Sequence, residues 1–411
     1  MRVLWITNVH LPAVCKEIGH VSPVYGGWIY ASLNALRDAY PEIEFAVATL
    51  YNGENFRVVD DSAVKYFMLP SKLENTTYDK SLEILWHKVH AEFRPDVVHI
   101  YGTEFPLGLS YIRACGSMNV CISIQGLVSE IAKFYYAGIT KADIIYNITI
   151  RDILRCDSII QQRNKFKKRG EYEIEYISSV PNIIGRTSWD RAHIWAINPN
   201  AQYYFCNETL RSVFYQYRWR YNNCEKHTIF LSQAGYTIKG LHKVLEAMPL
   251  VLRHFPDARI RIAGENIIDK PFYRITGYGK YIRSLIKKFN LEGKISFLGI
   301  LQAEQMCEEY LRANVFICPS SIENSPNSLG EAQILGTPHI AANVGGVCDM
   351  MVSNEDCLYQ FEEVVVLAEK ICKVFAETVY EDCVILEEAK KRHNRTLNTH
   401  ALVNIYKEIT K

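Results

Sequence analysis

The sequence of 411 residues is long enough for two domains, and a hydrophobic fraction of 48% can fill two separate cores. The formal net charge is only +1 and neither half of the chain is strongly basic, which argues against nucleic acid as a partner. No window approaches the roughly 18 uninterrupted apolar residues of a membrane-spanning helix. None of the 12 cysteines forms a Cys-x-x-Cys pair, which predicts a reducing, cytoplasmic setting without a zinc site.

The first half of the chain predicts a doubly wound α/β domain. A buried strand at 3–7 begins almost at the N-terminus, without the apolar core and cleavage site of a signal peptide. Gly26 and Gly27 follow a long loop at 8–24 and open a helix, so a ligand is able to approach the backbone there, although an ordinary turn would also use them. The other elements expected in this half are strands at 45–50, 64–69, 96–100, 120–124 and 203–206 and helices at 29–40, 78–93 and 208–217.

Three polar residues of the first half are candidates for contact with a ligand. Glu104 and Gln125 each lie in the loop after a predicted strand, and ligands of open α/β sheets bind at the carboxyl ends of the strands. Arg186, in a loop further along, is able either to clamp an anionic or sugar group or to tie the loop down. His99 lies inside an apolar strand and is interpreted as a hydrogen-bonded core residue.

A basic run at 163–169 contains five cations with Phe166 among them. Such a run is able to lie on an anionic membrane surface, and the alternative is a solvated helix end. The polar stretch 218–226 is the expected linker and places the domain boundary between 221 and 222.

The second half repeats the α/β pattern. Lys239 and Gly240 come after a buried strand and open a helix, which favours a phosphate contact for the lysine over a simple surface position. Gly264 closes a later strand, and Leu301 lies in the loop after the next one. The elements expected here are strands at 228–232, 258–264 and 294–298 and helices at 241–255, 304–313, 364–379 and 399–409.

The segment 318–346 carries the most information. An apolar run at 315–318 predicts a buried parallel strand, and the polar cluster 324–328 begins a helix that Gly336 ends. The N-terminus of a helix offers backbone N–H groups and the positive end of a dipole, which suits a diphosphate. The residues expected to contribute at this terminus are Asn327, Ser328 and Leu329.

Two carboxylates flank this helix start. Glu323 precedes the helix and Glu331 lies inside it, and carboxylates readily accept hydrogen bonds from the vicinal hydroxyls of a sugar or ribose. With the seven residues 324–330 between them, and followed by Gly345 and Gly346, they resemble the E-x7-E element of the retaining GT-B glycosyltransferases of family 4.

The resemblance implies a GT-B fold of two Rossmann-like doubly wound domains that face each other across a cleft. An acceptor-binding domain is then expected at 1–221, a nucleotide-sugar-binding domain at 222–396, and a C-terminal helix at 397–411 that crosses back to the first domain. In the family the first Glu faces the donor sugar and the second holds the ribose, which assigns these roles to Glu323 and Glu331.

Other residues receive roles from the same resemblance. Lys239 would neutralise the diphosphate and is, with Glu323, the expected catalytic pair. The remaining donor-binding residues would be Gly26, Gly27, Gly264, Leu301, Asn327, Ser328 and Leu329. The sequence departs from the family at two positions, because Ala234 stands where an Arg is usual and Gln125 where many relatives carry a His. Arg186 or a nearby lysine is a candidate replacement for the missing cation.

The implied activity is transfer, with retention, of a sugar from a UDP- or GDP-sugar to a saccharide or lipid-linked acceptor, as in bacterial surface polysaccharide or glycolipid synthesis. No metal and no cofactor beyond the nucleotide sugar co-substrate is expected. The expected location is cytoplasmic, with peripheral contact at the inner face of an anionic plasma membrane. The alternatives are a GT-B-fold nucleotide-sugar epimerase and a non-catalytic nucleotide-sugar-binding subunit.

Overall fold

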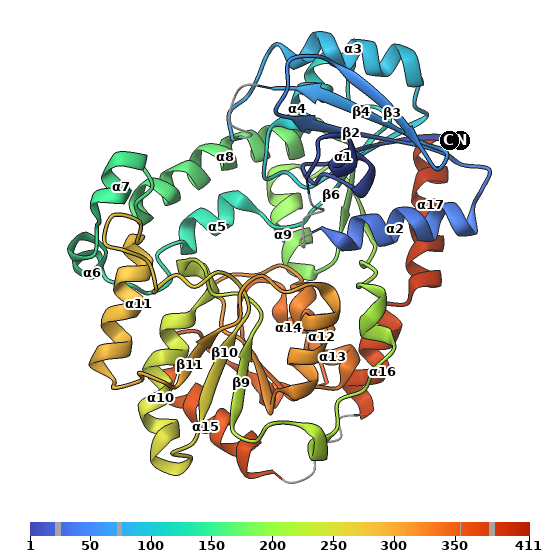
Figure 1. Cartoon of the computed structure of the whole chain (residues 1–411). Coiled ribbons are helices and arrows are strands. Elements are labelled where there is room, and N and C mark those ends of the chain that lie inside the picture. Colours follow the sequence, from blue (N-terminus) through green and yellow to red (C-terminus); the bar gives the residue numbers. More distant parts are fainter. Residues whose placement is uncertain (21–25, 72–75, 354, 378–382) are drawn as a thin grey trace. The chain divides into compact units, whose positions relative to one another are not determined.

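The computed structural model describes residues 1–411 except 21–25, 72–75, 354 and 378–382 (Figure 1). The chain divides into two compact units. Unit 1 consists of Met1–Ala132, Lys165–Thr209 and His393–Lys411, and unit 2 of Lys133–Asn164 and Leu210–Arg392. Each unit is a parallel sheet with helices packed on it, as the alternating strand and helix pattern predicts.

Unit 1 contains an eight-stranded sheet in the order β3-β4-β2-β1-β5-β6-β7-β8, parallel except where β3 pairs antiparallel with β4. Its central strands are buried on both faces because helices cover the sheet from both sides, which is why they read as unbroken apolar runs. The strands are β1 (Arg2–Ile6), β2 (Glu44–Tyr51), β3 (Arg57–Asp61), β4 (Val64–Pro70), β5 (Val97–Tyr101), β6 (Val120–Ser123), β7 (Asn182–Gly185) and β8 (Gln202–Phe205).

The helices of unit 1 come from all three of its segments. They are α1 (Pro12–Glu17), α2 (Gly27–Ala39), α3 (Leu82–Phe93), α4 (Leu107–Cys115), α9 (Ser188–Ile197) and α17 (Arg395–Ile409). Two more helices, α5 (Val128–Phe134) and α8 (Ile159–Ser179), carry the chain from one unit to the other.

The C-terminal helix α17 packs on unit 1, which confirms the expected return of the chain to the first domain. Its Tyr406 hydroxyl accepts a hydrogen bond from Trp5 Nε1 at 3.1 Å and lies 2.6 Å from Nδ1 of His99. His99 is 1% exposed, and burial lowers its pKa to about 3, so it is the neutral core residue that the sequence indicates.

Unit 2 contains a six-stranded, all-parallel sheet in the order β11-β10-β9-β12-β13-β14. Its strands are β9 (Thr228–Leu231), β10 (Arg259–Ile262), β11 (Ile295–Phe297), β12 (Val315–Cys318), β13 (His339–Ala342) and β14 (Leu358–Tyr359). Its helices are α6 (Lys141–Tyr146), α7 (Ile150–Arg155), α10 (Leu241–His254), α11 (Gly277–Lys288), α12 (Ala303–Arg312), α13 (Asn327–Leu335), α14 (Val347–Met350), α15 (Val364–Ala376) and α16 (Cys383–Arg392). Short 3-10 turns are η1 (Ser212–Tyr215), η2 (Tyr221–Asn223), η3 (Thr237–Lys239) and η4 (Glu355–Cys357).

The division differs from the boundary expected between 221 and 222, because residues 133–164 of the first half belong to unit 2. Polar contacts fix this insertion there: Thr237 Oγ1 donates to the Tyr135 carbonyl, and His242 Nε2 lies 2.8 Å from the Ala137 carbonyl. These contacts join residues about a hundred positions apart in the sequence. The composition of the linker therefore could not predict that residues 133–164 belong to unit 2.

Three local expectations for the first half were wrong. The loop at 8–24 contains α1, which Pro12 starts at the first helical position, and residues 21–24 of that loop lie outside the described structure. The loop after residue 180 is β7 followed by α9, which begins with a capping box between Thr187 and Asp190. The helix expected at 208–217 is only the 3-10 turn η1.

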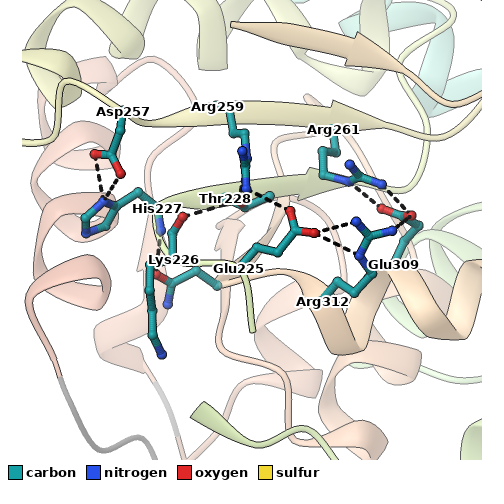
Figure 2. A network of polar contacts seen from close by, with 10 residues as sticks. Glu225, Lys226, His227, Thr228, Asp257, Arg259, Arg261, Glu309 and Arg312 are labelled. Carbon is teal, nitrogen blue, oxygen red and sulfur yellow. Dashed lines mark hydrogen bonds and ion pairs between the residues drawn. The ribbon is translucent and has the colours of Figure 1, made fainter. Parts of the chain in front are cut away.

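A network of ion pairs ties the chain just before β9 to its neighbours in unit 2 (Figure 2). The network lies at the amino ends of the strands of the unit 2 sheet. The Glu225 carboxylate accepts from Arg259 at 2.8 Å and from Arg312 at 3.0 Å. Arg261 and Glu309 form a bidentate pair with both N–O distances at 2.6 Å. The network therefore anchors the incoming chain at the opposite end of the strands from the loops that carry the candidate site.

Candidate active site

The start of α13 is the centre of the candidate site in unit 2. Strand β12 is fully buried and ends at Cys318, and Pro326 is the N-cap of α13 with extended backbone angles. The Leu329 N–H, which the sequence assigns to a phosphate, donates back to the Pro326 carbonyl at 3.0 Å. The Ser328 carbonyl accepts from the Tyr310 hydroxyl at 2.9 Å, which holds the first turn of the helix in place.

Lys239 and Glu323 lie together, although 84 residues separate them in the sequence. Lys239 Nζ is 2.6 Å from Glu323 Oε1, and the Ser320 hydroxyl donates to the same oxygen at 2.7 Å. Burial alone lowers the pKa of Lys239, but the adjacent Glu323 carboxylate outweighs it and raises the pKa overall. The two predicted catalytic residues thus form one charged pair.

The backbone at Gly240 explains how Lys239 reaches this position. Gly240 has φ of 68°, and a Cβ there would come within 1.7 Å of the Pro319 carbonyl oxygen. Only glycine allows the turn η3 to approach the end of β12 so closely. The Lys-Gly pair in the sequence therefore places a cation beside the loop that leads to α13.

Glu331 is 5% exposed and is held by Arg211. Nε and Nη2 of Arg211 donate to Oε1 of Glu331 at 2.9 and 2.7 Å. Burial raises the pKa of Glu331, and the guanidinium opposes that shift. Sequence reasoning missed Arg211, because it lies outside the motif and its neighbours predict only a helix.

The two remaining donor candidates of unit 2 lie at the same edge of the sheet. Gly264 follows β10, has φ of 110° and donates its N–H to the Gly299 carbonyl at 2.8 Å. Leu301 follows β11 and packs against the core cluster beneath α13. Because all strands of this sheet run parallel, these loops share the carboxyl-end edge with Lys239 and Glu323.

Gly26 and Gly27 lie in unit 1 at the start of α2. Gly26 has φ of 79°, and a Cβ at this position would come within 2.5 Å of the Val9 side chain. The position therefore requires glycine for its backbone conformation and for the close approach of the loop after β1.

Arg186 ties the loops of unit 1 together. It is 6% exposed, pairs with Glu208 at 2.8 Å, and donates to the carbonyls of Ile124 and Gln125, both at 3.1 Å. These contacts correspond to the loop-tying alternative for Arg186. They also place Gln125 and Arg186 side by side at the carboxyl ends of β6 and β7.

Glu104 shares this edge with a second acid, Glu173, which the sequence did not single out. Glu173 is fully buried and accepts from Thr103 Oγ1 at 2.6 Å and from the Val128 N–H at 2.9 Å. Desolvation raises the pKa of Glu104 to about 7, and the nearby Glu173 charge adds to that effect. The edge of unit 1 thus holds a carboxyl group that changes its charge near neutral pH.

We expect Glu104 to make folding stability depend on pH. Its pKa is higher in the folded than in the unfolded chain, so the folded state loses stability as the pH rises from about 4.5 to about 7. Glu104→Gln should remove this contribution. Between pH 5 and pH 8 the wild-type free energy of unfolding should therefore fall by about 1–3 kcal/mol relative to the variant. Parallel denaturant titrations measure the difference, and a constant gap between the two proteins would contradict the shift.

Only part of the basic run at 163–169 is exposed, and membrane contact through it, which the sequence offers beside a solvated helix end, stays a prediction. Consecutive residues of α8 point to all sides of the helix. Arg169 is 8% exposed and stacks on Phe166 at 4.1 Å, and Arg163 stacks on Tyr136 at 5.0 Å. Only Lys167 and Lys168 of the five cations are exposed.

Two kinds of feature are absent from the described part of the chain. Among these residues no group of three or more His, Cys, Asp or Glu side chains is arranged to hold a metal ion. In the same residues no helix combines the length and the apolar character needed to span a bilayer.

Comparison with known proteins agrees with this arrangement. Residues 216–393 match the family model of glycosyl transferases group 1. The chain is 26% identical to sulfoquinovosyl transferase SQD2 of Arabidopsis thaliana over 172 residues, and 24% identical to mannosylfructose-phosphate synthase of Agrobacterium fabrum over 198 residues. These matches cover 42% and 44% of the chain but only 30% and 42% of the relatives, so the chain spans less than half of their length.

Solved structures resemble the whole chain. Sucrose-phosphate synthase of Thermosynechococcus elongatus is similar with a TM-score of 0.71 at 15% identity, covering 99% of this chain and 98% of that one. Anabaena HepE, solved in complex with UDP and glucose, is similar with a TM-score of 0.64 at 13% identity, covering 98% of both chains. The expected fold, two Rossmann-like domains of the GT-B type, is thereby confirmed.

Proposed function

We propose, from the match of residues 216–393 to the family model of glycosyl transferases group 1, that this chain transfers a sugar from a nucleoside diphosphate sugar to a hydroxyl acceptor. The observation that carries the proposal is the Lys239–Glu323 pair beside the N-terminus of α13. A cation, a carboxylate and a helix N-terminus together provide for a diphosphate and the sugar attached to it.

In this proposal Lys239 exchanges its contact with Glu323 for a contact with the diphosphate. The charge that develops on the leaving diphosphate is then stabilised by the ammonium group and by the dipole of α13. Glu323, released from Lys239, accepts hydrogen bonds from hydroxyls of the donor sugar. No metal is needed for this step, because the cation and the helix supply the positive charge.

Glu331 is proposed to hold the ribose. Both Arg211 hydrogen bonds converge on Oε1, and Oε2 is the oxygen that we assign to the ribose hydroxyls. Arg211 opposes the rise in the pKa of Glu331 that burial causes, and so favours the ionised carboxylate, which is the stronger acceptor. Arg211 also adds a cation to a donor site in which Ala234 replaces the usual arginine.

The acceptor is assigned to unit 1, at the edge formed by Glu104, Gln125 and Arg186. We propose a saccharide or lipid-linked saccharide, with retention of configuration at the transferred sugar, in the synthesis of a surface polysaccharide or glycolipid. A UDP-sugar is the first donor to test, because the structurally similar HepE was solved with UDP-glucose.

A second candidate function is binding of a nucleotide sugar without turnover. Ala234 and Gln125, which stand where relatives carry an Arg and a His, favour it. A nucleotide-sugar epimerase, the third alternative, would need no acceptor.

A donor screen by thermal shift, followed by a turnover assay, tests the proposal. One class of UDP- or GDP-sugar should raise the melting temperature, and the matching nucleoside diphosphate should do so as well. Incubation with that donor and a panel of saccharide acceptors should release nucleoside diphosphate. Binding without release would favour the non-catalytic alternative, conversion to an epimeric donor would favour the epimerase, and no stabilisation by any nucleotide sugar would overturn the donor site.

A further inference from the structure

Helices α6 and α7 of the inserted segment expose an unusual number of large apolar side chains. Figure 1 shows the two short helices beside α11. Five residues in one stretch of the chain form what we call the hairpin patch, and each is more than half exposed: Ile145 61%, Tyr146 78%, Ile150 59%, Ile153 65% and Leu154 79%. Isolated apolar residues are normal on a protein surface, but a contiguous group indicates an interaction surface.

In the pair of helices α6 and α7, called the hairpin here, two polar residues point inward and the five apolar residues of the patch point outward. Thr149 and Asp152 are 7% and 1% exposed and form a capping box at the start of α7. Thr149 Oγ1 donates to the Ile275 carbonyl at 3.0 Å, and the Asp152 carboxylate accepts from the Gly277 N–H at 2.9 Å. This is the reverse of an ordinary surface helix, whose apolar side faces the core.

The neighbouring chain extends the apolar surface. Phe272 and Tyr273, 73% and 58% exposed, lie just before Ile275 in the segment that leads into α11. Because Ile275 and Gly277 are hydrogen-bonded to α7, these two aromatic residues lie within a few residues of the hairpin. Tyrosine and phenylalanine beside aliphatic residues are typical of proteins that dip into the interfacial region of a bilayer.

The charges around the patch are predominantly positive. Lys141, Arg155 and Arg274 are exposed, and Lys280 extends over the Tyr146 ring and donates to the Tyr146 carbonyl at 2.8 Å. The acidic residues of the hairpin are engaged with their own surroundings: Asp143 accepts from the Thr140 hydroxyl at 2.6 Å, Asp152 binds the start of α11, and Asp157 pairs with Arg151 at 2.9 Å.

We propose that the hairpin patch docks unit 2 onto an anionic lipid bilayer, with the apolar side chains in the interface and the cations on the lipid headgroups. The apolar side chains match the interfacial region of a bilayer, and the basic residues around them match its anionic headgroups. A second copy of this chain fits less well, since a symmetric contact through the patch would bring the same cations of both copies together. The proposal concerns binding alone and stands whether or not the chain transfers sugar.

Co-sedimentation of the full chain with lipid vesicles tests this proposal. At low salt the wild-type protein should sediment with vesicles that contain about a quarter phosphatidylglycerol and remain largely in solution with phosphatidylcholine alone. The double variant Ile153→Asp/Leu154→Asp should bind the anionic vesicles at least about tenfold more weakly. Both side chains are exposed, so the melting temperature of the variant should match the wild type.

Two control variants make the experiment specific. Ile84→Asp changes an apolar residue of α3 that is 76% exposed and should leave vesicle binding unchanged. Lys167→Gln/Lys168→Gln removes the two exposed cations of the run in α8, and should weaken binding much less than Lys141→Gln/Arg155→Gln.

Each possible outcome either supports or rejects docking of the hairpin patch on an anionic bilayer. Failure of the wild type to bind anionic vesicles at low salt would overturn the proposal, and so would binding that the hairpin variants do not weaken. If mass photometry shows a dimer that the Ile153→Asp/Leu154→Asp variant disrupts, the patch belongs to a second copy and the bilayer assignment fails. The donor screen uses no lipid. The proposed sugar transfer and the proposed docking on a bilayer can therefore each fail without the other.

Discussion

Replacing Glu323 with alanine should reduce sugar transfer by about 10²–10³-fold, the range typical for the loss of one transition-state electrostatic contact. The carboxylate is proposed to contact only the sugar, so the affinity for the nucleoside diphosphate should stay nearly unchanged. Lys239 loses its partner at 2.6 Å in this variant and becomes more available to a phosphate, which also protects nucleotide affinity. Steady-state kinetics and calorimetry with the free nucleotide measure the two effects separately.

A matched control exists in the same unit. Lys243 pairs with Glu362 at 2.6 Å, a lysine–glutamate contact of the same length that is not part of the candidate site. Glu362→Ala should leave both turnover and nucleotide binding close to wild type. Parallel loss of turnover and of nucleotide affinity in Glu323→Ala would show that Glu323 does not face the sugar.

The second large effect is expected at Glu331. Glu331→Gln removes the charge of the proposed ribose acceptor and should weaken donor and free nucleotide alike, by about 1–3 kcal/mol. Loss of the ionised partner also leaves the Arg211 guanidinium with a weaker acceptor, so Arg211 becomes less well ordered. Calorimetry with nucleoside diphosphate gives the affinity directly.

Arg211 allows an independent check of the same site. Arg211→Ala removes the group that opposes the burial-raised pKa of Glu331, so the carboxyl should bind a proton more readily in this variant. Its nucleotide affinity should then fall more steeply toward low pH than that of the wild type. If Glu331→Gln leaves the nucleotide affinity unchanged, the ribose assignment is wrong, whatever affinity is measured for Arg211→Ala.

Local patterns predicted the parts of the fold that local physics determines. The strand at 315–318 and the helix start near 327 were found because a doubly buried parallel strand is a continuous apolar run and because polar residues cluster at helix starts. The spacing of Glu323 and Glu331, through its resemblance to the E-x7-E element, pointed to both carboxylates of the candidate site.

The features that the sequence did not predict depend on contacts between residues that are far apart in the chain. Arg211 reaches Glu331 across 120 positions, and nothing near either residue indicates their pairing. A count of the cations in the basic run does not show how many are exposed, because the helix turns Arg169 inward onto Phe166. The sequence did not single out the apolar residues at 145–154, and their exposure in the structure shows them as a surface.

The three-segment composition of unit 1 has a consequence for how the protein is made. Tyr406 completes the hydrogen bonding of Trp5 and His99, and it lies close to the end of the chain. During synthesis from the N-terminus, unit 2 can gather all of its residues before the ribosome reaches His393, whereas strand β1, which is made before unit 2, must wait for α17, which is made after it. The unit that is begun first is therefore the one that is completed last, and its early chain depends on chaperones or on transient packing until α17 arrives.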